Sequence, residues 1–227
     1  MAQIDFKREM IFLNIVYFGA PGCGKRTWVR FMHDNAGNSE AIIEESLENE
    51  SSMSFAWDPW GGIKIEGFSH VFNFRTCSFD MDDRPPSRSK ILGEADGLVF
   101  IADSLMENVN QTSLYFNEMI RQLRSFGVDV TDGNAEANES IPNLVSDKIS
   151  NLQISKVPLV IAYNKRDLPH CASMAELDKT LAFNSACKFE AIGKEGFGTY
   201  GTFKYLEHRI IDGIHQRKGL LELIDGD

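Results

Sequence analysis

The stretch Gly19-Ala-Pro-Gly-Cys-Gly-Lys-Arg-Thr27 is the strongest indication of the fold of this chain. It nearly matches the P-loop pattern G-x-x-x-x-G-K-[S/T], in which glycines let backbone N–H groups surround phosphate oxygens and the lysine adds a positive charge. The continuous apolar run at residues 10–18 predicts a buried parallel strand, and Trp28, Phe31 and Met32 follow the loop at helical spacing. Strand, loop and helix therefore stand in the order that a phosphate-binding loop requires.

Seven residues of this stretch are candidates for phosphate binding: Gly19, Gly22, Cys23, Gly24, Lys25, Arg26 and Thr27. Arg26 stands where the pattern has the hydroxyl that binds magnesium. A guanidinium can pair bidentately with phosphate but cannot ligate a metal, and helical geometry turns the Thr27 hydroxyl by about 100° from the required direction. We therefore expect nucleotide binding to be better preserved than catalysis. The alternative is a tight turn in a fold that has lost its ligand.

A second motif predicts the base. Residues 157–163 are typical of another buried strand, and Asn164-Lys-Arg-Asp167 follows it, at the edge where doubly wound sheets bind ligands. A carboxylate at Asp167 can accept from both N1–H and the exocyclic amine of guanine, a donor pair that adenine lacks. Asn164, Lys165 and Asp167 are thus predicted to bind guanine, with GTP or GDP as the cofactor. Taken alone, these four residues could also form a charged turn that caps a helix.

With these motifs the chain resembles the MglA-type small Ras-like GTPases of bacterial gliding motility and cell polarity. The resemblance extends over about residues 12–214 and rests on residues 14–25, 95–104 and 163–169. It implies an α/β, Ras-like P-loop fold with a mostly parallel central sheet and helices on both faces. It also implies a GDP/GTP-dependent switch, a roadblock-domain regulator and other motility or polarity proteins as partners.

The resemblance places further site residues. Gly193 and Lys194 correspond to a loop whose backbone N–H reads guanine O6 and whose lysine packs over the base. Ser52 occupies the position of the switch I threonine that contacts the metal, with Ser54 as the other candidate. Candidate metal ligands are therefore Thr27 and Ser52, and the position of Arg26 puts magnesium binding in doubt.

Switch II departs most from the family pattern. Phe79 stands where a glycine allows close approach to the γ-phosphate, and Asp80 replaces the glutamine that orients water in many relatives. The sequence therefore predicts a guanine-nucleotide-binding regulator with weak or no GTP hydrolysis. The alternatives are an active GTPase that depends on an activator protein and a nucleotide-free pseudo-GTPase that acts as an interaction module.

Length and composition agree with one Ras-like domain over residues 1–227. The formal net charge of −10 and pI near 5.0 argue against a nucleic-acid partner. We find no apolar run near the roughly 20 residues of a membrane span and no secretory signal, so we expect a cytoplasmic protein without direct membrane insertion. Residues 128–155 are predicted to be an insertion, whose acidic part is mobile, and residues 216–227 a C-terminal tail.

Two local predictions concern the sheet. Residues 70–74 read as a short, edge-like strand. The aromatic residues Phe55, Trp57 and Trp60 are expected to pack beneath the sheet, although exposed tryptophans after switch I would also suit a partner-binding surface.

Overall fold

The computed structural model describes residues 2–37, 39–47, 50–65, 67–77, 86–131 and 156–224. Within these ranges, ten strands form the sheet: β1 (Gln3–Asp5), β2 (Met10–Phe18), β3 (Ile43–Leu47), β4 (Glu50–Trp57), β5 (Lys64–Ile65), β6 (Phe68–Thr76), β7 (Gly97–Asp103), β8 (Asp129–Thr131), β9 (Lys156–Asn164) and β10 (Cys187–Glu190). The helices of the same ranges are α1 (Lys25–Asn35), α2 (Pro86–Gly93), the 3₁₀ turn η1 (Met106–Asn108), α3 (Val109–Ser125), α4 (Met174–Leu181) and α5 (Thr199–Ile224).

The sheet has the order β10-β9-β7-β2-β6-β4-β3, with β1 beside β2, β5 beside β6 and β8 beside β9. The strands from β10 to β6 along this order are parallel, whereas β4 and β3 run antiparallel to their neighbours. Parallel neighbours need crossover connections, and helices supply them here. Their carboxyl ends meet at one edge, so the loops after β2, β7, β9 and β10 gather there.

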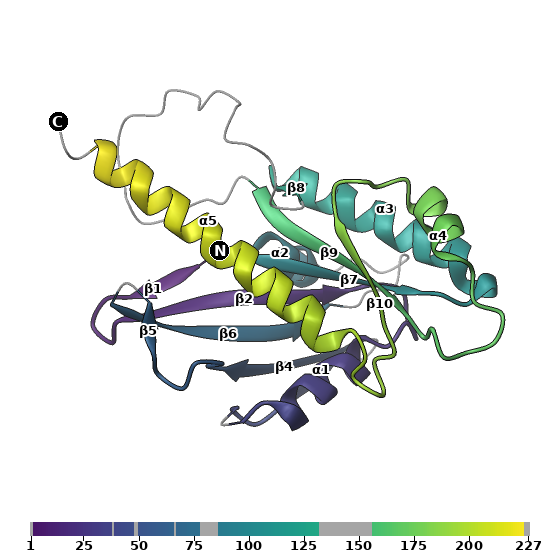
Figure 1. Cartoon of the computed structure of the whole chain (residues 1–227), viewed down its shortest axis with the longest axis horizontal. Coiled ribbons are helices and arrows are strands. Elements are labelled where there is room, and N and C mark those ends of the chain that lie inside the picture. Colours follow the sequence, from purple (N-terminus) through teal and green to yellow (C-terminus); the bar gives the residue numbers. More distant parts are fainter. Residues whose placement is uncertain are drawn as a thin grey trace.

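Helices cover both faces of the sheet. One core lies between the sheet and helices α1 and α5, and it includes Trp28, Phe72, Phe74 and Phe203. The other lies between the sheet and helices α2, α3 and α4. Figure 1 shows α5 crossing the front of the sheet and α2 behind it. This layering confirms the predicted α/β class with a mostly parallel central sheet, as in a Ras-like P-loop fold.

The strands that flank the two motifs match their predictions. Strand β2 covers Met10–Phe18, and its residues from Leu13 onward are buried because other strands and helices enclose it on all sides. Strand β9 ends at Asn164, the first residue of the second motif. Both motifs therefore begin at the carboxyl edge of the sheet, where ligands bind in open α/β folds.

Strand β6 corrects one sequence-based prediction. Residues 70–74 were expected to form an edge-like strand, but β6 spans Phe68–Thr76 and pairs with β2 on one side and β4 on the other. The misleading signals were the polar residues His70 and Asn73. His70 is nevertheless buried, and the Asn73 side chain donates to Asn14 Oδ1 at 3.3 Å.

The aromatic cluster after switch I belongs to the core, as expected. Phe55 and Trp57 are buried, and the partly buried Trp60 packs against the same core, with its ring centroid 5.9 Å from that of Phe72. Phe55 stacks on Phe74 with ring centroids 4.6 Å apart, and Trp57 contacts Phe203 of α5 at 5.4 Å. Phe55 and Trp57 are therefore unavailable as exposed anchors for a partner.

Two segments differ from the predicted divisions of the chain. The predicted insertion begins at residue 128, yet Val128 is buried and β8 pairs in parallel with β9. The start of that segment is therefore part of the sheet, and residues 132–155 lie outside the described residues. Helix α5 continues to Ile224, through most of the predicted tail.

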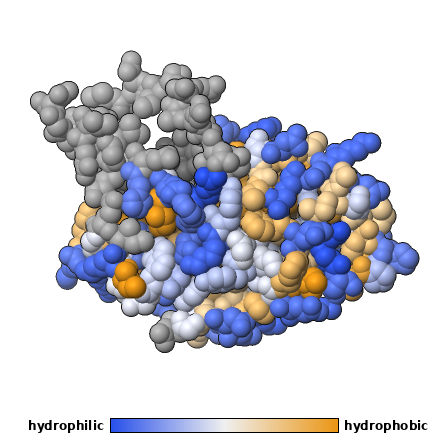
Figure 2. Space-filling view, in the orientation of Figure 1, coloured by the Kyte–Doolittle hydropathy of each residue, from blue (hydrophilic) through white to orange (hydrophobic). Residues whose placement is uncertain are grey.

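The surface is mainly hydrophilic, with separate hydrophobic patches, on the face seen in Figure 2. This pattern agrees with the acidic composition of the chain. Among the described helices, none combines the length and the apolar character that crossing a membrane demands.

Candidate nucleotide-binding site

The glycine loop has a backbone that side chains would obstruct. A Cβ atom at Gly19 would lie 2.3 Å from the carbonyl oxygen of Ile101 in β7. Gly24 has φ 106° and ends the loop, and a Cβ there would lie 2.5 Å from Nδ2 of Asn164. No side chain caps the first turn of α1 at Gly24. The first N–H groups of α1 thus face a position that suits an anion.

Lys25 lies across this loop. Its side chain is buried, and Nζ donates to the carbonyl oxygens of Gly19 at 2.6 Å and Ala20 at 2.8 Å. A third contact, to Cys23 Sγ, is long at 3.7 Å. An ammonium carries three donors, so this third donor can turn to a phosphate oxygen while the other two hold the lysine in place.

Asn164 joins the three motif segments. Its Nδ2 donates to the carbonyl oxygen of Cys23 at 2.8 Å, and its Oδ1 accepts from the N–H of Gly193 at 2.8 Å. The side chain is buried, so both hydrogen bonds are shielded from water. The structure therefore brings together the phosphate loop, the Asn164–Asp167 segment and the loop around Gly193, although 141 residues separate Cys23 from Asn164.

Lys165 and Asp167 have separate charged partners. Lys165 has φ 67°, and its Nζ donates to Asp103 Oδ2 at 2.7 Å. Asp103 ends β7 directly beside Asn164 in the sheet register. Asp167 Oδ2 lies 2.6 Å from Lys194 Nζ, and this ion pair holds the pKa of the Asp167 carboxyl below its usual range. The carboxylate that would accept from guanine is thus ionised.

Asp103 is a residue of this site that the sequence reasoning did not assign. Besides Lys165, it accepts from the N–H of Leu105 at 3.1 Å and from Nδ2 of Asn108 at 2.9 Å. It therefore orients the lysine from a buried position. In the sequence, Asp103 could have been recognised as a site residue because it ends a buried strand, one position before Ser104.

The loop around Gly193 refines the prediction for guanine O6. The N–H of Gly193 is used by Asn164, and the N–H of Glu195 donates to the carbonyl oxygen of Ile192 at 2.9 Å. Within the described hydrogen bonds of this loop, the N–H of Lys194 has no acceptor in the chain. It is therefore the backbone donor available to guanine O6, while the Lys194 side chain lies against Asp167.

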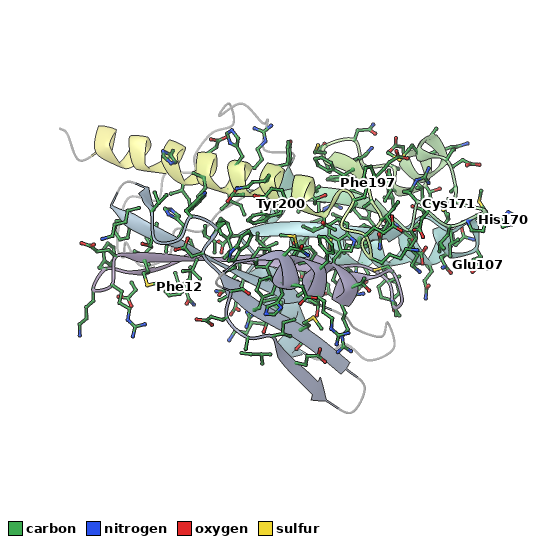
Figure 3. The ribbon with its side chains drawn as sticks, turned by 60° about the horizontal axis from the view of Figure 1, so that its bottom comes forward. Phe12, Glu107, His170, Cys171, Phe197 and Tyr200 are labelled. Atoms are coloured by element: carbon green, nitrogen blue, oxygen red, sulfur yellow. The ribbon has the colours of Figure 1, made fainter. Side chains whose placement is uncertain are left out.

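The loop that carries Asp167 is fixed at its far end. Leu105 forms a β-bridge with Cys171, and the N–H of Met106 donates to the carbonyl oxygen of His170 at 3.1 Å. Figure 3 shows His170 and Cys171 near Glu107 at one end of the molecule, while Phe197 and Tyr200 lie closer to the start of α5. These contacts anchor the far end of the predicted guanine-binding segment.

The candidate metal ligands do not form a recognisable magnesium site. The Arg26 side chain donates to Glu44 of β3, and Thr27 is exposed on α1. Ser52 lies within β4, opposite Glu45 of β3, and is partly buried. Magnesium prefers oxygen ligands in octahedral geometry, and a guanidinium offers only N–H donors. The residue at the metal-binding position thus does not fit the ion.

Phe79 and Asp80, the switch II positions that depart from the family pattern, fall outside the described residues.

No protein-family model matches the chain. The chain is similar to the mutual gliding-motility protein MglA of Myxococcus xanthus (strain DK1622): the two are 29% identical over 208 residues, which cover 90% of this chain and 93% of that protein. The similarity extends well beyond the three motifs, because it includes nearly all of both chains. The resemblance found in the sequence is thus confirmed: the chain is similar to an MglA protein over nearly its whole length.

Proposed function

We propose that this protein binds GTP and GDP and acts as a regulatory protein in motility or polarity signalling, with weak or no intrinsic GTP hydrolysis. The observation that carries the proposal is the double hydrogen bond of Asn164 to Cys23 and Gly193. It ties the predicted phosphate loop to both predicted guanine-binding segments, so the groups that would hold the two ends of one nucleotide lie side by side.

A guanine nucleotide would need one rearrangement in this site, at Lys194. The phosphates would lie on the N–H groups of the glycine loop and the first turn of α1, beside the Lys25 ammonium. Guanine would meet the Asp167 carboxylate and the N–H of Lys194. To let the base reach Asp167, the Lys194 ammonium moves aside, which costs little because its side chain is 59% exposed.

Weak hydrolysis follows from what the chain lacks at the γ-phosphate. In-line attack of water needs a cation that neutralises the developing charge and a group that orients the water. Arg26 replaces the hydroxyl that would hold magnesium, and Asp80 replaces the water-orienting glutamine of many relatives. A carboxylate near the γ-phosphate would repel the negative charge that develops in the transition state, and would therefore raise the barrier to hydrolysis.

The partner proposal rests on the relative. The named relative is a gliding-motility protein, and we extend to this chain a roadblock-domain regulator and other motility or polarity proteins as partners. With a net charge of −10, nucleic acid is a poor partner. A cytoplasmic location without direct membrane insertion completes the proposal.

The test is a titration of nucleotide-stripped protein with fluorescent GDP and GTP. We expect saturable binding that unlabelled GDP displaces and ATP does not, together with phosphate release no faster than that of a Lys25→Ala variant. Release that rises on adding a roadblock-domain partner would favour the activator-dependent GTPase instead. No binding of either nucleotide would leave the pseudo-GTPase.

A further inference from the structure

One carboxylate lies between two arginines at the phosphate end of α1. Glu44 of β3 accepts from Nη2 of Arg26 and, through its other oxygen, from Nη2 of Arg30 at 2.6 Å. The arginines are four residues apart and so lie on one side of the helix. Together the three groups carry a formal charge of +1, and the hydrogen bond from Arg30 is the main reason why the pKa of Glu44 lies below its usual value.

Arg26 occupies the position at which P-loop proteins bind magnesium. It is the second residue of α1 and follows Lys25, where P-loop proteins have the hydroxyl that binds magnesium. Its partner belongs to the β3–β4 hairpin, whose strand β4 contains Ser52, the candidate switch I residue. The Arg26–Glu44 pair therefore joins the predicted phosphate loop to the strand that pairs with the candidate switch I segment.

We propose that Arg26 takes the place of magnesium, and that nucleotide phosphate and Glu44 compete for its guanidinium. This inference rests on the proposed guanine-nucleotide binding. When a nucleotide binds, Arg26 pairs with a phosphate oxygen and Glu44 stays on Arg30 alone. Binding is then independent of metal, and it loosens the attachment of the β3–β4 hairpin to α1.

The partial exposure of Arg26 and Glu44 favours the replacement of Glu44 by a phosphate on the Arg26 guanidinium. Arg26 and Glu44 are 39% and 38% exposed, so water weakens their ion pair. A phosphate offers a guanidinium the same two parallel, charge-assisted hydrogen bonds as a carboxylate, and the phosphates of a nucleotide carry more negative charge than one carboxylate. Arg30 keeps Glu44 from being left without a partner. Strand β3 is the last strand of the sheet order, held on one side by β4, so it can shift without breaking the central sheet.

The experiment measures the Kd of fluorescent GDP with magnesium and with chelator, for the wild type and three variants. For the wild type we expect the two values to agree within about threefold. Arg26→Ser should bind roughly 10-fold or more weakly in chelator, since a charge-assisted contact is lost, and magnesium should restore much of the affinity. Glu44→Gln should bind GDP about threefold or more tightly, because Arg26 is released from a competing charge.

The control and a second readout guard against indirect effects. Glu9→Gln removes a carboxylate from an exposed ion pair with Lys64, distant in sequence from the cluster, and should bind GDP as the wild type does. Hydrogen exchange of the β3 amides should speed up on GDP binding in the wild type and not in Arg26→Ser.

The outcomes separate the two proposals. Wild-type binding that disappears in chelator would overturn the role of Arg26 while leaving guanine-nucleotide binding intact. Equal GDP affinity of Glu44→Gln and the wild type, with unchanged exchange at β3, would overturn the competition. Absence of GDP binding under every condition would overturn the proposed function, and this inference with it.

Discussion

Replacement of Asn164 by alanine tests whether one buried side chain holds the site together. The change removes the Nδ2 donor to the carbonyl of Cys23 and the Oδ1 acceptor for the N–H of Gly193. Both partners lie in segments that are packed against the core, and Asn164 is only 3% exposed. Two backbone groups would then be left without a hydrogen bond where water has little access.

The expected cost can be worked out from these contacts. A buried polar group without its partner costs roughly 1–3 kcal/mol, so two such groups give about 2–4 kcal/mol when some local relaxation is allowed. A domain of this length shifts its melting temperature by about 2–4 °C per kcal/mol. Asn164→Ala should therefore lower the melting temperature of the nucleotide-free protein by roughly 5–15 °C, before any effect on ligand binding.

The assay is thermal unfolding of the nucleotide-stripped protein, followed by circular dichroism. Asn35→Ala is a matched control, since Asn35 also donates through Nδ2 to a backbone carbonyl, that of Phe31 at 2.8 Å, but from an exposed position. The control should melt within about 2 °C of the wild type. Equal melting temperatures for the two variants would refute the bridging role of Asn164.

Three further predictions concern single side chains. Asp167→Asn should weaken GDP binding by roughly 100-fold or more, because two charge-assisted hydrogen bonds to guanine are lost; direct titration checks it, and unchanged affinity would mean that guanine is read elsewhere. Burial raises the pKa of Asp96 from an ordinary 3.8 to about 6, so the folded state binds the extra proton and stability falls as the pH rises between these values. In Asp96→Asn the loss of unfolding free energy between pH 4.5 and 7 should be smaller than in the wild type by on the order of 1–3 kcal/mol. Urea unfolding at the two pH values measures it, and an equal loss in both proteins would contradict the prediction. Burial raises the pKa of Cys77 to about 12. Iodoacetamide at pH 8 should therefore label the partly exposed Cys171 and Cys187 well before Cys77, and mass spectrometry of the native protein measures the order of labelling. Equally fast labelling would show that Cys77 is accessible.

Several elements of this protein can be predicted from local patterns in its sequence. Strand β2, the glycine loop and the start of α1 follow from a continuous apolar run, a glycine pattern and helical spacing, each complete within about 25 residues. The same holds for β9 and the Asn164–Asp167 segment. Such patterns work because backbone conformation and burial are set by neighbouring residues along the chain.

Which of these segments meet, and through which atoms, depends on long-range packing. Asn164 reaches Cys23 and Gly193, and Lys165 reaches Asp103, because parallel strands bring their carboxyl ends to one edge in a register that no local pattern encodes. The interior place of β6 was hidden in the same way, since pairing on both sides depends on strands far away in the sequence. The sequence marked Arg26 as out of place, but its pairing with Glu44 depends on how the β3–β4 hairpin packs beside α1. The residue types of a motif predict the chemistry of its site, whereas long-range packing determines which side chains come into contact there.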